Sequence, residues 1–313
     1  MNFEKIAIIG AGIMGHGIAQ VMAQGGKQVI LTDLSEQLLN NARDKIRAGL
    51  QLLAANNMCV PWEIEPALER IYYTTDLQAV ADADLIIEVI PERWPLKAQL
   101  YKQLATISKK GAVWVSNTSG MPINKLAELT DRPELFAGLH FFMPAHLVPL
   151  VEVIQGASTK HEVIQNLLSL LTELGKSPVH VKMDIPGFIG NRLQHALARE
   201  AMSLLQKGVA SAADIDTVVK TSLAMRLVFT GPLEQRDLNG LDTHLSIAEY
   251  LYVDLENSTQ PLPVLSDKVK AGMLGLKTGE GFYDWRQTTQ AAVVERKNQQ
   301  LIDMVKLLQS SKT

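Results

Sequence analysis

One histidine and one glutamate are spaced so that they could share a proton. His140 lies at the end of the apolar run FAGLHFF, and Glu152 lies inside the next apolar run, VPLVEVI. A histidine suits the removal of a hydroxyl proton because its pKa lies close to neutral pH. A carboxylate in an apolar strand is costly to bury alone, so we expect the two side chains to satisfy each other. Glu152 would then fix the tautomer of His140 and favour its protonated form; the alternative is a purely structural histidine.

A glycine-rich turn near the N-terminus has the spacing of a dinucleotide-binding site. The stretch GAGIMG, residues 10–15, matches G-x-G-x-x-G, follows an apolar strand at once and opens a helix. The first glycine can make the tight turn, the second can admit a pyrophosphate, and the third can let helix pack on strand. The helix N-terminus then supplies free N–H groups for the phosphates. The alternative is a tight turn without a ligand; the cofactor residues predicted here are Gly10, Gly12, Ile13, Met14 and Gly15.

Asp33 ends the second expected strand, where a carboxylate would accept hydrogen bonds from an adenosine ribose. Its negative charge would repel a 2′-phosphate, and no arginine follows directly, so we expect NAD rather than NADP. Asp33 could also cap the helix that begins after Leu34. The two roles are compatible.

Composition limits the kind of protein. A chain of 313 residues with 47% apolar and 20% charged residues fits two globular domains. A net charge of −3 gives no basic footprint, so we expect no nucleic-acid partner. Cys59 is a lone cysteine and the histidines show no ligand spacing, so we expect no disulfide and no metal. Without a presequence or a run of about 18 apolar residues, we expect a cytoplasmic protein with no membrane partner.

The order of the predicted elements indicates two kinds of domain. Strands alternate with helices up to about residue 181, which predicts a mostly parallel sheet covered on both faces, with a helical hairpin inserted before residue 71. From Pro186 onward strand signals disappear and apolar residues recur at helical spacing. We therefore expect an α/β domain over 1–184 and an all-α domain over 185–313. The expected strands are KIAIIG, QVILTD and residues 71–74, 84–90, 112–117, 136–142, 148–154 and 178–181.

Seven segments taken together resemble the L-3-hydroxyacyl-CoA dehydrogenase family. The match runs in the right order over nearly the whole chain. The resemblance implies a Rossmann-like N-terminal domain with a helical hairpin insert, and a C-terminal helical domain that usually makes a homodimer. The segments are GAGIMG, SNTS (116–119), FAGLHFF (136–142), LVEVI (150–154), PGFIGNRL (186–193), GPLE (231–234) and KTGEGFYDW (277–285).

The resemblance also implies roles for individual residues. His140 is similar to the family's general acid/base and Glu152 to its orienting partner. Ser119 and Asn191 match positions that hold the substrate oxygen and the nicotinamide region. The residues that would contact the cofactor are Glu92, Lys97, Asn117 and Lys277. Other readings stay open: Glu92 and Lys97 as an exposed charge pair, Ser119 as a helix cap, and Asn191 as a polar position in a packed helix.

Two departures from the family concern the substrate. The family usually reads HFFNP, whereas Met143 can donate no hydrogen bond. Acyl-CoA enzymes of the family tend to carry lysines near the CoA phosphates, but residues 52–58 read LLAANNM. Locally, VPLVEV, SLAMRLVFTGPLE and ERKNQQLIDMVKLL look similar to the lambda-crystallin or L-gulonate 3-dehydrogenase branch, near which carnitine dehydrogenase lies.

Several functions follow from these patterns. We expect a dehydrogenase that uses NAD to interconvert 3-hydroxy and 3-keto groups of a small-molecule substrate, either a CoA thioester or a free acid of the L-gulonate or carnitine type. A non-catalytic, crystallin-like NAD-binding protein is a different class, disfavoured because Ser119, His140, Glu152 and Asn191 are all present. A phosphogluconate-type enzyme is disfavoured because GFIGNRL offers no lysine where that group's helix carries one.

Overall fold

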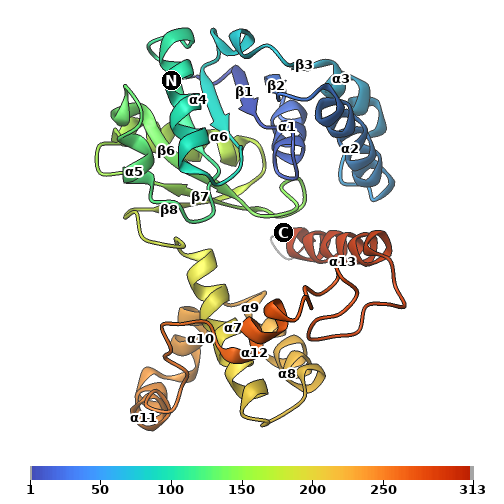
Figure 1. Ribbon diagram of the computed structural model, residues 1–313, viewed down its shortest axis with the longest axis vertical. Helices are drawn as coiled ribbons and strands as arrows, with labels where there is room; N and C mark the ends of the chain where they lie inside the picture. Colours follow the sequence, from blue (N-terminus) through green and yellow to red (C-terminus); the bar gives the residue numbers. More distant parts are fainter. Residues whose placement is uncertain (1, 311–313) are drawn as a thin grey trace. The chain divides into compact units, whose positions relative to one another are not determined.

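The computed structural model describes residues 2–310. These residues form two compact units (Figure 1). The first unit holds residues 2–191 together with 298–310, and the second holds residues 192–297. No helix among the described residues is long and apolar enough to cross a membrane.

The first unit is built on an eight-stranded sheet with the order β3-β2-β1-β4-β5-β6-β7-β8. All neighbouring strands are parallel except β6 and β7, which pair antiparallel. The strand order reverses between β1 and β4, and ligands of open α/β sheets bind at the carboxyl ends of strands beside such a reversal. The eight expected strands and the mostly parallel sheet are confirmed. The strands are β1 (Lys5–Ile9), β2 (Gln28–Thr32), β3 (Ile71–Thr74), β4 (Leu85–Glu88), β5 (Val113–Ser116), β6 (Phe136–Phe141), β7 (Leu150–Ile154) and β8 (Ser177–Val181).

Helices cover both faces of this sheet because its central strands are apolar on both sides (Figure 1). Successive side chains of a strand point to opposite faces. In β1, Ile6 and Ile8 join the core under α1, α2 and α6, whereas Ala7 and Ile9 join the core under α4 and α5. The helices of this unit are α1 (Gly15–Gln24), α2 (Glu36–Ala55), α3 (Ile64–Glu69), α4 (Trp94–Ile107), α5 (Ile123–Ala127) and α6 (His161–Glu173).

Local signals set the ends of these helices. Ser35 caps α2 by accepting a hydrogen bond from the Leu38 N–H. Residues with positive φ follow α1 and α6, at Gly26 and Gly175. α2 and α3 lie between β2 and β3, so the inserted helical hairpin is confirmed.

The second unit is helical, and isolated bridges at residues 275–284 are the sole β pairing among its described residues. It has little core of its own: among its described residues, three are buried, namely Ser203, Ile215 and Leu262. Its helices are the greater part of α7 (Gly190–Gln206), α8 (Ala212–Val218), α9 (Ala224–Leu227), α10 (Pro232–Asn239), α11 (Leu241–Leu251), α12 (Pro263–Lys270) and the first part of α13 (Gln290–Ser310), with a π-helical turn at Val219–Leu223 between α8 and α9.

The first unit ends at residue 191, a few residues after the boundary that the sequence suggests at residue 184, and the second unit begins at residue 192. The second unit ends at residue 297, inside α13, and the last part of this helix belongs to the first unit. No sequence pattern predicts this return of the chain to the first unit. The division into domains of residues 1–184 and 185–313 stays a prediction.

Gly138 tests how tightly the sheet is packed two residues before His140. A Cβ at this position would lie 2.8 Å from Ile123 Cδ1 and 2.9 Å from Ile154 Cβ, both core atoms. We expect Gly138→Ala to lower the free energy of unfolding by about 1–3 kcal/mol because the core is overpacked. Urea unfolding measures the change. Gly111→Ala is the control, since a Cβ there meets nothing within 4 Å; equal stabilities of the two variants would contradict this packing.

Candidate active site and dinucleotide pocket

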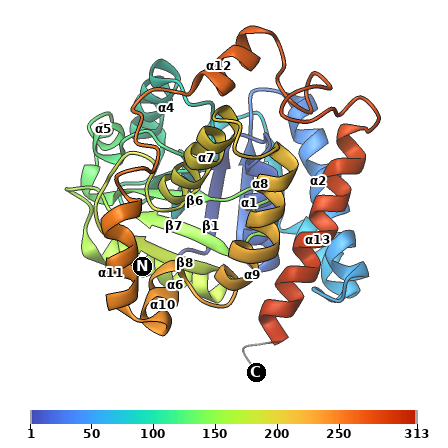
Figure 2. The same ribbon diagram turned by 90° about the horizontal axis from the view of Figure 1, so that it is seen from below.

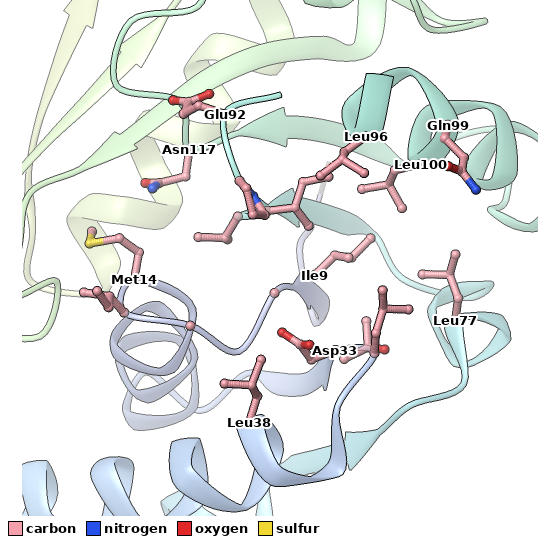
Figure 3. A pocket seen from close by; sticks show the side chains of 18 of the residues that line it. Ile9, Met14, Asp33, Leu38, Leu77, Glu92, Leu96, Gln99, Leu100 and Asn117 are labelled. Carbon is pink, nitrogen blue, oxygen red and sulfur yellow. The ribbon is translucent and has the colours of Figure 1, made fainter. Parts of the chain in front are cut away.

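A pocket of about 740 Å³ opens at the carboxyl ends of β1, β2 and β4 (Figure 3). Met14, Glu92 and Asn117 lie at one end of it, and Asp33, Leu38 and Leu77 lie at the other. An elongated site with polar groups at both ends and apolar walls suits a dinucleotide. The predicted cofactor residues that line it are Gly10, Gly12, Ile13, Met14, Asp33, Glu92 and Asn117.

The three glycines of the turn have the surroundings that their predicted roles require. Gly10 has φ +112°, and a Cβ there would lie 2.7 Å from the Val89 carbonyl oxygen. A Cβ on Gly15 would collide with the Gly10 carbonyl oxygen, so this position allows α1 to approach β1. A Cβ on Gly12 would meet nothing within 4 Å and would project into open space. The residues present therefore fit a pyrophosphate at the N-terminus of α1.

Asp33 is tied to this turn. Its Oδ2 accepts a hydrogen bond of 2.8 Å from the Ala11 N–H, and its Oδ1 accepts one of 3.3 Å from the Ser35 N–H. Ser35, rather than Asp33, caps α2. Asp33 lines the pocket, so its carboxylate is placed for a ribose and would repel a 2′-phosphate.

His140 and Glu152 are directly opposite each other on the antiparallel strands β6 and β7. The distance between His140 Nδ1 and Glu152 Oε2 is 2.8 Å, so the predicted pairing is confirmed. With Nδ1–H donated to the carboxylate, Nε2 is the nitrogen that can take a proton. Phe142 and Phe188 flank the imidazole, with ring centroids 4.4 and 5.7 Å from it.

The second oxygen of Glu152 is also held. Its Oε1 accepts hydrogen bonds from the backbone N–H groups of Ile189, at 2.9 Å, and Gly190, at 2.8 Å, at the start of α7. Burial raises the pKa of Glu152, but the hydrogen bonds from His140, Gly190 and Ile189 outweigh it, so the pKa lies below its usual value. The buried carboxyl is therefore ionised at neutral pH and faces the imidazole as an anion.

Two hydrogen bonds connect the pocket to this pair. Asn117 Oδ1 accepts from the N–H of Phe141, the residue after His140, at 2.9 Å. Asn191, which follows the Glu152 contact at Gly190, donates through Nδ2 to the Ser119 carbonyl oxygen at 2.8 Å. Since Asn117 and Ser119 line the pocket, its Glu92 end lies beside the pair. Ser119 is not a helix cap, because α5 begins after Pro122.

Glu92 and Lys97 form an ion pair in which Glu92 is exposed and Lys97 is buried. Glu92 Oε1 accepts from the Ser119 N–H at 2.8 Å and from the Thr118 hydroxyl at 2.7 Å. The side chain of Lys97 is 1% exposed, and its Nζ lies 2.7 Å from both oxygens of Glu88 and 3.4 Å from Glu92 Oε2. Lys97 thus connects Glu92 to the buried Glu88 through ion pairs. Its direct contact with the cofactor stays a prediction.

Glu88 is a residue that the sequence patterns missed. It ends β4 and is buried, and it also accepts hydrogen bonds from the hydroxyls of Tyr101, at 2.9 Å, and Ser116, at 2.7 Å. The sequence does contain a signal for Glu88, because a charged residue ends the apolar strand LIIE. His140 gives the same kind of signal, a polar residue near the end of an apolar strand. Lys277 lies in the second unit, so its predicted role stays a prediction. No group of three possible metal ligands occurs among residues 2–310.

Comparison with known proteins agrees with this site. Residues 5–185 match the family profile of the 3-hydroxyacyl-CoA dehydrogenase NAD binding domain, and residues 187–285 match the profile of the C-terminal domain. A probable 3-hydroxybutyryl-CoA dehydrogenase of Deinococcus radiodurans is 40% identical over 282 residues, which cover 90% of this chain and 100% of the relative. A 5-formyl-3-hydroxy-2-methylpyridine 4-carboxylate 5-dehydrogenase of Mesorhizobium japonicum is 33% identical over 307 residues, 98% of each chain.

Among solved structures, the crystal structure of a 5-formyl-3-hydroxy-2-methylpyridine 4-carboxylic acid 5-dehydrogenase, described as an NAD+-dependent dismutase, superposes with a TM-score of 0.93. It is 33% identical, and the match covers 98% of this chain and 99% of that one.

Fold and site together define an NAD-dependent oxidoreductase with a two-part, Rossmann-plus-helical plan. More particularly, the chain belongs to the 3-hydroxyacyl-CoA dehydrogenase family.

The buried ion pair below the pocket should be important for stability. In Lys97→Met the Glu88 carboxylate stays buried without its counter-charge, which typically costs about 3–5 kcal/mol. We expect the thermal unfolding midpoint to fall by more than about 6 °C, since about 2–4 °C corresponds to 1 kcal/mol in a domain of this size. Lys125→Met is the control, because Lys125 pairs with Glu128 at the exposed surface and should change stability by at most about 1 kcal/mol. Similar midpoints for the two variants would mean that the buried pair contributes little.

Proposed function

We propose that the chain interconverts a 3-hydroxy and a 3-keto acyl group with NAD, and that His140 is the general acid/base. The observation that carries this proposal is the contact between His140 Nδ1 and Glu152 Oε2, beside the dinucleotide pocket. NAD, when bound, supplies the hydride acceptor of the oxidation.

In the direction of oxidation, Nε2 of His140 accepts the hydroxyl proton while the carbon–hydrogen bond gives up its hydride, so that the alcohol becomes a ketone. The imidazole then carries a positive charge, which the Glu152 carboxylate stabilises through Nδ1–H. Glu152 can do so because its other oxygen is fixed by the N–H groups of Ile189 and Gly190. In the reverse direction His140 returns the proton to the carbonyl oxygen.

The remaining predicted residues have supporting roles in this proposal. Ser119 and Asn191 would hold the substrate oxygen, which their position between pocket and pair supports. Glu92 and Asn117 would face the nicotinamide half, Asp33 the ribose, and the glycine turn the pyrophosphate. Lys97 and Lys277 are proposed as cofactor residues on the family resemblance.

The acyl substrate could be one of two kinds, a CoA thioester or a free carboxylic acid. The family and the relative from Deinococcus favour a CoA thioester. Two different observations favour a free carboxylic acid. Met143 is exposed at the position where the family has an asparagine. The relative from Mesorhizobium matches this chain over 98% of its length, and its name gives a pyridine carboxylate as substrate.

We also propose a cytoplasmic homodimer formed through the second unit. With three buried residues among residues 192–297, this unit buries too little to be stable by itself. Large apolar side chains such as Leu233, Leu238, Leu245 and Val253 are more than half exposed. Exposed apolar side chains in such number are typical of subunit interfaces.

Replacing His140 by glutamine tests the reaction. His140→Gln should lower kcat by about 10²–10⁴-fold while NADH still binds, because a general base is lost and the pocket is intact. Reduction of acetoacetyl-CoA and of acetoacetate by NADH, followed at 340 nm, measures the rate, and NADH fluorescence measures binding. His161→Gln, at an exposed position, is the control. Activity near that of the control would refute the assignment.

A charged residue in the apolar surface of α11 tests the dimer. Leu245→Glu should convert a dimer into monomers, because a carboxylate cannot be buried cheaply in an interface. Light scattering after size exclusion measures the mass. Tyr72→Glu, on the edge strand β3 of the first unit, should leave the mass unchanged. A wild-type chain that is monomeric at micromolar concentration would overturn the proposal.

A further inference from the structure

The last helix lies outside the part of the chain that the family profiles describe. The profile of the C-terminal domain ends at residue 285, and α13 spans Gln290–Ser310. From residue 298 onward this helix belongs to the first unit, where it lies beside α2 (Figure 2). The end of α13 is thus an additional helical segment packed on the first unit.

The contact is made by buried side chains. Ile302 is fully buried against Leu53 of α2 and Leu147, which are 4% and 2% exposed. Asn56 Oδ1, at the end of α2, accepts hydrogen bonds from Gln299 Nε2 at 3.1 Å and Lys306 Nζ at 3.0 Å. Together, an apolar centre and flanking polar bonds make this a specific docking site.

The docking site also includes the loop that follows the catalytic strand. Leu147 lies in the loop between β6 and β7, seven residues after His140. The same loop is fixed by Lys176, whose Nζ donates to the carbonyl oxygens of Ala145 and Val148 at 2.6 and 3.1 Å. α13 therefore packs at the end of α2 together with a residue of the β6–β7 loop.

The covered surface is poor in positive charge. Residues 52–58, LLAANNM, contain no cation. Leu53 shares a buried cluster with Ile302, Leu52 and Met58 pack against that cluster, and Asn56 is bonded to α13. Lys306, the one cation among residues 298–310 of α13, already donates to Asn56. A carrier with several phosphate groups needs charged donors to offset its loss of water. Residues 52–58 offer it apolar side chains and the neutral amides of Asn56, which is already bonded, and Asn57.

We propose that α13 is a specificity element, which covers the surface between α2 and the β6–β7 loop and so restricts the enzyme to acyl substrates without a large phosphorylated carrier such as coenzyme A. The inference rests on the proposed function for the identity of the reacting group. It selects the free acid over the thioester as the better substrate of the full chain.

Undocking the helix tests this directly. Ile302→Asp places a charge in the apolar centre, and a chain ending at Thr289 lacks α13 altogether. Met304→Asp, at an exposed position on the same helix, is the matched control. Calorimetric titration with coenzyme A reports on the covered surface without any need for turnover. Circular dichroism confirms that each variant is folded.

Coenzyme A should bind the wild-type chain and Met304→Asp weakly, and should bind Ile302→Asp and the truncated chain at least tenfold more tightly. The ratio of kcat/KM for acetoacetyl-CoA to that for acetoacetate should rise by a similar factor. Equal affinity of all four proteins for coenzyme A, or weaker binding after truncation, would overturn the inference. If coenzyme A binds more tightly to the undocked variants but no substrate is reduced, the proposed reaction fails and the inference stands.

Discussion

The site depends on how the two oxygens of one buried carboxylate are shared. Glu152 gives Oε2 to the imidazole of His140 and Oε1 to two N–H groups at the start of α7. An anion in this apolar sheet would be unstable without such donors, and the donors keep its pKa low. One side chain therefore fixes the ring of the proposed base and joins β7 to the segment that carries Asn191. The same bonds hold the two strands and residues 189–190 together at the site.

The antiparallel pairing of β6 and β7 is what makes this sharing possible. In the register of the two strands, His140 faces Glu152 directly, and side chains so paired are about 5 Å apart at Cβ. A slip of one residue would turn Glu152 to the other face of the sheet. Gly138, two residues before His140, allows Ile123 and Ile154 to pack closely at the same place. The pair thus lies in a closely packed part of the core.

Much of the first unit could be predicted because its signals are local. Apolar strands, the glycine turn and the paired His140 and Glu152 follow from residue type and spacing, and all eight strands lie within a few residues of the expected positions. The burial of Lys97 could not be predicted, since its partner Glu88 lies on another element and a lysine in PERWPLK has the pattern of an exposed residue. The docking of α13 depends on contacts between residues about 250 positions apart, which periodicity does not reveal. The roles of Ser119 and Asn191 came from resemblance, because neither residue type indicates a site by itself.

The return of α13 makes residues 192–297 a long insertion between two parts of one unit. While this insertion is folded, its two ends are held at a fixed separation. If it unfolded, α13 would have to close a flexible loop of roughly 100 residues, at an entropic cost of about 4 kcal/mol. Order in the second unit and attachment of the final helix are therefore linked through chain entropy, even though the helix makes its contacts with α2.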